Sequence, residues 1–105
     1  GTPGGPSIEM LSQLITAPEM FKLYQNYPNP FNSMTTLSYE ISESGYLQLS
    51  IFNLAGQNVQ ILEEGLKQPG IYRVNWETGS LPSGVYFSQL LFDDQILSRK
   101  LLLLK

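Results

Sequence analysis

The chain has 105 residues, a net charge of −3, and neither cysteine nor histidine. This length fits one domain with one modest core, and the missing Cys and His exclude disulfides, the usual Ser-His-Asp and Cys-His catalytic groups, and zinc sites built on thiolates or imidazoles, so we expect no cofactor and no metal. The scattered Lys and Arg residues argue against nucleic acid as a partner, and no apolar run approaches the roughly 20 residues that span a bilayer.

Residues 1–20 are expected to be a linker or an expression remnant that precedes one folded domain over residues 21–105. The run from Gly1 to Pro6 is rich in Gly and Pro and is expected to be flexible. Ser7 could cap a short helix that ends at Ile15, because apolar residues recur there at helical spacing. An extended segment is the alternative, and Pro18 would end either one.

Pro, Asn and aromatic residues crowd between Leu23 and Asn32 in a pattern that neither helix nor strand can use. The central motif of this segment consists of Tyr27, Pro28, Asn29, Pro30, Phe31 and Asn32. The two prolines favour a bent path, which the side chains of Asn26, Asn29 and Asn32 can hold through bonds to the backbone. The aromatic side chains of Tyr24, Tyr27 and Phe31 are expected to clamp the segment onto a core.

From Phe21 onward, apolar residues recur with period two and are bounded by turn residues, which predicts an all-β domain. A short strand at 21–24 is followed by alternating strands at 37–41 and 47–52. Ala55-Gly56 marks a tight hairpin, after which Val59 and Ile61 are expected to face inward. The next strand is expected to place three side chains on its inner face: Tyr72, Val74 and Trp76.

The last two strands are expected at Val85–Phe92 and Ile96–Leu104, joined by a turn at Asp93-Asp94. Both are apolar at nearly every position, so we expect them to be buried on both faces or covered by a neighbour. The total of about seven strands predicts an immunoglobulin-like antiparallel β-sandwich.

These motifs in this order resemble a known family. The chain contains, in this order, the segments LYQNYPNPFN, TTLSYEI, LSIFNLAGQNV, GIYRVNWETGSLPSGVYFSQL and RKLLLLK. From about Leu23 to Lys105 this succession is similar to the type A C-terminal sorting domain of the type IX (Por) secretion system. Besides YPNPFN, the resemblance is carried by Gly56, Trp76, Ser83, Gly84, Val85 and Tyr86. The chain departs from the family at Gln57, where Arg is frequent, and at Ser33, where Pro is frequent.

The resemblance implies a non-enzymatic signal at the end of a protein exported by Bacteroidetes or related bacteria. Such domains are bound by the translocon and by outer-membrane shuttle proteins. A sortase-like peptidase commonly removes them and joins the cargo to surface lipopolysaccharide. The implied route passes through the periplasm to the outer membrane surface or the medium. Lys105 would then be the natural C-terminus, and cleavage would fall in the linker before Leu23.

The terminal segment has two interpretations, which are compatible if its strand lies at a sheet edge. It comprises Lys100, Leu101, Leu102, Leu103, Leu104 and Lys105. It could be the recognition strand, pairing through its backbone with a partner or with a second copy in a homodimer. A core strand is favoured for most of its side chains, and the two lysines would then discourage self-association.

Two other functions are weighed against the sorting signal. A sugar platform of a carbohydrate-binding or adhesive module could consist of Trp76, Tyr72 and Tyr86, although the place of Tyr72, Val74 and Trp76 on the apolar stripe favours a core role. The second alternative function is that of a structural immunoglobulin-like cap domain. The pairs Glu63-Glu64 and Asp93-Asp94 are poor candidates for catalysis or weak calcium binding, because strand neighbours point to opposite faces and Asp-Asp is common in turns.

Overall fold

The computed structural model describes residues 21–105, so the helical or extended segment considered for residues 7–15 lies outside the described range. Within that range every regular element is a strand, which confirms the predicted all-β class. The strands are β1 (Phe21–Leu23), β2 (Met34–Ile41), β3 (Gly45–Asn53), β4 (Asn58–Lys67), β5 (Gly70–Glu77), β6 (Gly84–Phe92) and β7 (Gln95–Leu103).

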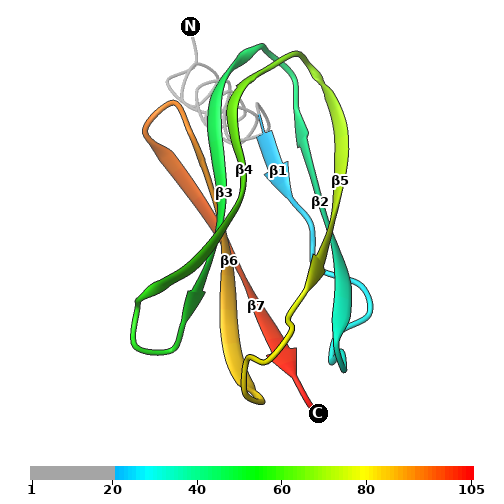
Figure 1. Ribbon diagram of the computed structural model, residues 1–105. Coiled ribbons are helices and arrows are strands. Elements are labelled where there is room, and N and C mark those ends of the chain that lie inside the picture. Colours follow the sequence, from blue (N-terminus) through cyan, green and yellow to red (C-terminus); the bar gives the residue numbers. More distant parts are fainter. Residues whose placement is uncertain (1–20) are drawn as a thin grey trace, which may run out of the picture.

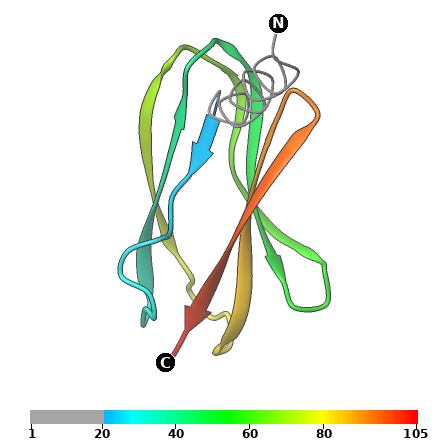
Figure 2. The same cartoon turned by 180° about the vertical axis from the view of Figure 1, so that it is seen from behind.

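The strands form two antiparallel sheets that face each other (Figure 1). One sheet has the order β1-β2-β5 and the other the order β4-β3-β6-β7. Immunoglobulin constant domains place the fourth strand in the first sheet, whereas here β4 pairs with β3. Seen from behind, β1 and β7 run next to each other along one open side of the sandwich (Figure 2).

The core lies between the sheets and is built from alternating side chains, as the period-two pattern predicts. On β2 the inward residues Leu37, Tyr39 and Ile41 are at most 1% exposed, and Trp76 of β5 is equally buried. The other sheet contributes the buried side chains Leu47, Leu49, Ile51, Tyr86, Leu90, Phe92, Leu101 and Leu103. Each fully buried aliphatic side chain stabilises the fold by about 1.5–3 kcal/mol relative to exposure.

Strand β4 is irregular, and this overturns one expectation. Its register with β3 shifts between Leu49 and Ser50 and again between Ile51 and Phe52. Each shift adds a residue to β4 and changes which side chains face inward. Val59 packs against the core as expected, but the prediction for Ile61 was wrong, because this side chain is 47% exposed.

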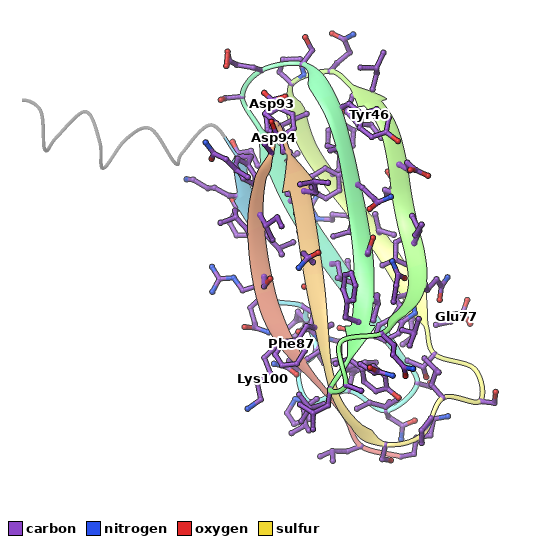
Figure 3. All side chains as sticks on the ribbon, turned by 90° about the vertical axis from the view of Figure 1, so that its left-hand side faces the viewer. Tyr46, Glu77, Phe87, Asp93, Asp94 and Lys100 are labelled. Carbon is purple, nitrogen blue, oxygen red and sulfur yellow. The ribbon has the colours of Figure 1, made fainter. Side chains whose placement is uncertain are left out.

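The expectation that β6 and β7 are buried on both faces was also wrong for most of β7. Leu101 and Leu103 fill the core, but Ile96, Ser98 and Lys100 on the outer face are exposed. β7 is the edge strand of its sheet, and no further layer covers this face among the described residues. Figure 3 views that face, where Lys100 pairs with Phe87 of β6.

The predicted turns are present at both ends of the sheets. Asp93 and Asp94 form the two-residue connection between β6 and β7, with φ angles of 51° and 65°. Such positive angles are tolerated better by Asp and Asn than by other side chains. Gly56, with a φ of 83°, occupies the turn between β3 and β4.

Candidate recognition site

The motifs that stand out in the sequence gather at one end of the sandwich, which we call the motif end. It comprises residues 26–33 between β1 and β2, the turn at 53–58, the loop at 78–84 and the segment 101–105. Figure 1 shows these connections together at the lower end, beside the C-terminus. Segments that are far apart in the sequence therefore form one surface.

An aromatic cluster forms the interior of the motif end. Phe31 packs on Trp76 with 5.7 Å between ring centroids, and Trp76 meets the edge of Tyr86 at 5.9 Å. The Trp76 indole N–H donates to Gln60 Oε1 at 3.0 Å. The Tyr86 hydroxyl donates to the Pro82 carbonyl at 2.8 Å, in the manner of the tyrosine corner of immunoglobulin-like folds. All three rings are at most 4% exposed, so none can stack on a sugar.

The opening motif is bound to the last strand through its backbone. The Phe31 N–H donates to the Leu102 carbonyl at 3.0 Å, and the Phe31 carbonyl accepts from the Leu104 N–H at 2.8 Å. The Asn29 side-chain oxygen accepts from the Leu102 N–H at 3.0 Å. These bonds satisfy backbone groups at the edge of β7 that would otherwise lack partners within the fold.

A buried amide holds the bend of the motif. Asn26 is 4% exposed, and its Nδ2 donates to the Pro28 carbonyl and to Thr35 Oγ1, both at 3.0 Å. The Gln25 side chain donates to Asn26 Oδ1 and to the Lys100 carbonyl. The sequence pointed to Asn26 and Asn29 as holding residues, but it gave no sign of Gln25. Thr35 could have been found from its place in the following strand, where the alternation puts this polar side chain on the inward face.

The three aromatic residues of the segment differ in their role. Phe31 is 2% exposed and anchors the segment, as predicted, whereas Tyr24 is 39% and Tyr27 81% exposed. The expectation of three anchors was therefore wrong for both tyrosines. Asn32 is exposed and makes no side-chain bond within residues 21–105. The peptide bonds before Pro28 and Pro30 are both cis.

The SGVY box and the end of the chain meet on the other side of the motif end. Ser83 Oγ accepts from the Lys105 N–H at 2.9 Å, and Lys105 Nζ donates to the Gly79 carbonyl at 2.6 Å. Gly84 begins β6, and Val85 lies opposite Leu102 of β7. The end of the terminal segment is thus hydrogen-bonded through both the backbone and the side chain of Lys105.

The exposed surface of the motif end is apolar around a shallow hollow. The hollow has a volume of about 340 Å³ and lies between the turn at Asn53–Ala55 and the loop at Leu81–Tyr86. Leu54 at its rim is 73% exposed, and Leu104 nearby along the same end is 52% exposed. With Tyr27 and the ammonium group of Lys105, this surface offers apolar contacts and positive charge, and no acid–base pair.

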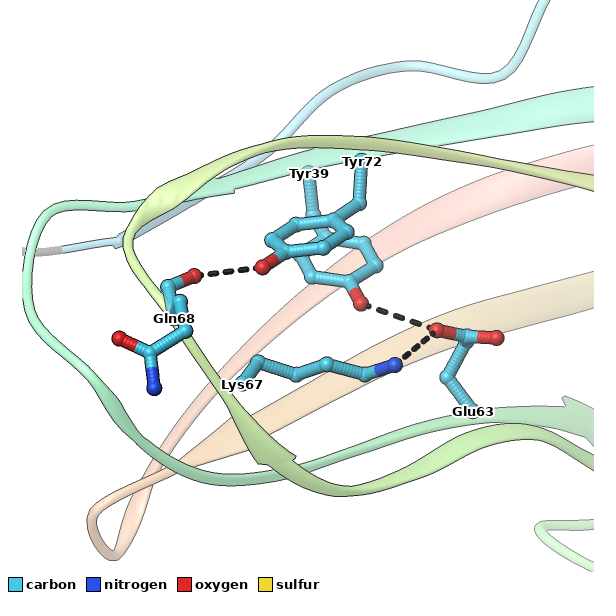
Figure 4. A network of polar contacts seen from close by, with 5 residues as sticks. All are labelled: Tyr39, Glu63, Lys67, Gln68 and Tyr72. Atoms are coloured by element: carbon cyan, nitrogen blue, oxygen red, sulfur yellow. Dashed lines mark hydrogen bonds and ion pairs between the residues drawn. The ribbon is translucent and has the colours of Figure 1, made fainter.

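Among residues 21–105, the titratable group with the largest pKa shift is Tyr39, which belongs to a polar network that connects β2 and β5 to β4 (Figure 4). The Tyr39 hydroxyl donates to Glu63 Oε1 at 3.3 Å, and Lys67 forms an ion pair with the same oxygen at 3.0 Å. Tyr72 stacks on Tyr39 and donates to the Gln68 carbonyl. Burial, followed by the negative charge of Glu63, raises the pKa of Tyr39 far above its usual value.

The acidic pairs do not form a reactive centre. Glu63 faces the inside of the sandwich, whereas Glu64 faces outward and accepts from Tyr46 and Gln48. Within residues 21–105, no group of side chains is arranged to hold a metal ion. In the same range, no helix is long and apolar enough to cross a membrane.

Comparison with protein families identifies the family of the chain. The family model described as secretion system C-terminal sorting domain matches residues 25–104, which is most of the chain. No curated protein matches the chain. The matched range begins two residues before Tyr27 and includes each segment of the motif end except Lys105.

We expect alkaline pH to unfold the protein partly through Tyr39. Its folded-state pKa lies above its unfolded value of 10.0, so its stabilising contribution is complete below pH 10 and is lost as the pH rises beyond that value. Urea unfolding at several pH values between 8 and 11 should show this fall. The Tyr39→Phe variant should show a shallower fall, and Tyr27→Phe, a change at an exposed ring, should behave as wild type. Equal slopes for all three proteins would contradict the assignment.

The two aromatic residues of the motif should respond in opposite ways to truncation. Phe31→Ala removes a buried ring and should lower the free energy of unfolding by about 3–5 kcal/mol. Tyr27→Ala removes an exposed ring and should change it by about 0.5 kcal/mol or less. Chemical denaturation of both variants measures this difference. A similar loss in the two variants would show that the loop is not clamped through Phe31.

Proposed function

The chain belongs to the family of type IX secretion system C-terminal sorting domains. We therefore propose that it directs an upstream cargo protein through that system and that it is itself non-enzymatic. The family is one of sorting signals, and it implies export toward the outer membrane or the cell surface. The observation that carries the proposal is the collinear match over residues 25–104. The finer steps below are our own proposals.

We propose that the translocon and its outer-membrane shuttle proteins contact the motif end. Support comes from the convergence of all the signature motifs on this surface and from its exposed apolar side chains, Tyr27, Leu54 and Leu104. Exposed apolar groups that gather on one surface are typical of interaction sites. The buried motif residues Phe31, Trp76 and Tyr86 shape this surface from below.

We further propose that a sortase-like peptidase cleaves in the linker before Leu23 and transfers the cargo to the outer membrane surface, with the periplasm as the intermediate compartment. In support, β1 is the shortest strand of the sandwich and lies at a sheet edge. Cleavage in the linker ahead of β1 would leave all strands of the sandwich intact.

The alternative functions have less support. A carbohydrate-binding module needs exposed aromatic rings, and Trp76 and Tyr86 are buried while Tyr72 is stacked on Tyr39. A structural cap domain shares the fold, but no observation favours it over the family match.

The proposal is tested by attaching residues 21–105 to the C-terminus of a periplasmic reporter in a bacterium with a type IX system. We expect the reporter at the cell surface or in the medium of this strain, and in the periplasm of a strain that lacks the translocon. Retention in the periplasm of both strains would refute the sorting function, provided that a known sorting domain is exported in parallel.

A surface variant separates recognition from folding in the same assay. Leu54→Ser and Leu104→Ser together alter exposed side chains of the motif end, so the fold should persist while export falls. Ile71→Ser is the matched control, because Ile71 is 58% exposed on the polar outer face of the other sheet. Normal export of the double variant would place recognition elsewhere and would leave the sorting function itself intact.

A further inference from the structure

Four strands lie at the edges of the two sheets, and three of them are protected against pairing with another chain. β1 has only three residues. β4 is interrupted by two register shifts, and Glu63 carries a charge inward from it. In β7 the Arg99 guanidinium turns inward and donates to the Leu23 carbonyl, and Gln25 and Phe31 bond to the backbone of this strand. Short strands, bulges, inward charges and covering segments all prevent an edge from accepting a strand.

The remaining edge strand, β5, has none of these devices. Its eight residues pair with β2 without a register shift, and no described strand lies beyond it in its sheet (Figure 1). The side chains that it directs toward the core are Tyr72, Val74 and Trp76, none of which is charged. Among residues 21–105, β5 is therefore the edge most open to another strand.

The backbone of β5 presents free hydrogen-bonding groups along this edge. Thr36 of β2 bonds through its backbone to Tyr27, on the side away from β5. Asn75 lies opposite Thr36, so the N–H and C=O groups of Asn75 point away from β2. Because backbone direction alternates along a strand, Arg73 and Glu77 point the same way. Within residues 21–105 the outward N–H and C=O groups of these three residues have no partner.

We propose that β5 pairs with β5 of a second copy, forming a two-fold symmetric dimer in which the two smaller sheets become one continuous antiparallel sheet. The two-fold axis passes between Asn75 and Asn75 of the second copy. This register places Arg73 opposite Glu77 of the second copy, and symmetry repeats that contact. All three residues direct their backbone groups toward the contact, so each opposed pair exchanges two hydrogen bonds.

Charge complementarity selects a second copy as the occupant. Arg73 and Glu77 are both exposed, and the ion pair that forms within residues 21–105 involves neither of them. Opposite charges directly across two antiparallel strands stabilise their pairing, whereas a register centred on Arg73 would oppose two like charges. Such a pattern rejects strands that lack the matching charges. The edge of β5 itself carries the matching sequence.

The side chains beneath this part of β5 are also suited to pairing. The charge that lies closest to the inner side of β5 is at the other half of the strand, where Lys67 Nζ is 5.6 Å from the ring centroid of Tyr72. Beneath residues 73–77, the Trp76 indole is already bonded to Gln60, and Val74 is only partly buried. The added strand removes more of the Val74 side chain from water, which favours association.

A single introduced cysteine tests the register, because the chain has no other cysteine. In Asn75→Cys the two thiols face each other across the axis, with Cα atoms about 5.5 Å apart, within the range of a disulfide. Ile71→Cys is the matched control on the same exposed face of β5, where the two positions are displaced by roughly 27 Å along the strands. On mild oxidation only Asn75→Cys should form a covalent dimer. Equal cross-linking of both variants, or none in Asn75→Cys, would overturn the register.

Sedimentation of the 105-residue chain over a range of concentrations tests the dimer itself. Arg73→Glu and Glu77→Arg should each raise the dissociation constant about tenfold, because two attractive pairs become repulsive, and the double variant should recover. Lys22→Glu, an equal charge change at an exposed residue of β1, should behave as wild type. Circular dichroism verifies that all variants are folded. A monomeric wild type at millimolar concentration, or a double variant as weak as the single ones, would refute the proposal.

Ionic strength provides a further check on the same proteins. High salt should weaken the wild-type dimer and reduce the difference between wild type and the two single charge variants, since the paired charges are exposed to solvent. A difference that persists unchanged in high salt would contradict the assigned ion pairs. The dimer does not depend on the sorting function, because it is measured on the isolated chain.

Discussion

The motif end is held together by the two backbone hydrogen bonds that Phe31 makes with Leu102 and Leu104, at the end of β7. These bonds place the Phe31 ring against Trp76. The segment that bends at Asn26 lies along the edge of β7, where Gln25 and Asn29 bond to its backbone. They also close backbone groups that would otherwise be open to pairing with other chains. A motif that reads as an irregular loop is in this sense a short parallel partner of the last strand, and its prolines and asparagines are the residues suited to that path.

The strands were predictable because each sheet is exposed to solvent on one face, which makes apolar and polar residues alternate along β2, β3 and β5. The failures have separate physical causes. Ile61 was misplaced because a bulge leaves no mark on the hydrophobic pattern. The apolar run in β7 suggested two buried faces, but it reflects a core face at Leu101 and Leu103 and an exposed edge at Ile96. In the motif itself no periodicity exists, so composition could not tell which of its three aromatic rings points inward.

The candidate site was only partly visible in the sequence for a related reason. Trp76 could be assigned to the core from its place in an alternating strand. The convergence of four separate segments on one end, however, is a property of the topology. Gln25 and Thr35 join the site only because the chain bends back over β7 and β2. A buried motif residue cannot touch a partner, so any recognition of the motif must act through the surface that these residues support.

The bonds between Phe31 and Leu102 also set an order of events during synthesis. The two residues are separated by most of the domain, and the ribosome releases Leu102 only after nearly every other strand has been made. The first corner therefore cannot close on a chain that stops early, and contacts so distant in sequence form late in folding. A closed motif end therefore requires β7 to be present, so the same hydrogen bonds that stabilise the fold make the first corner of the sandwich depend on its seventh strand.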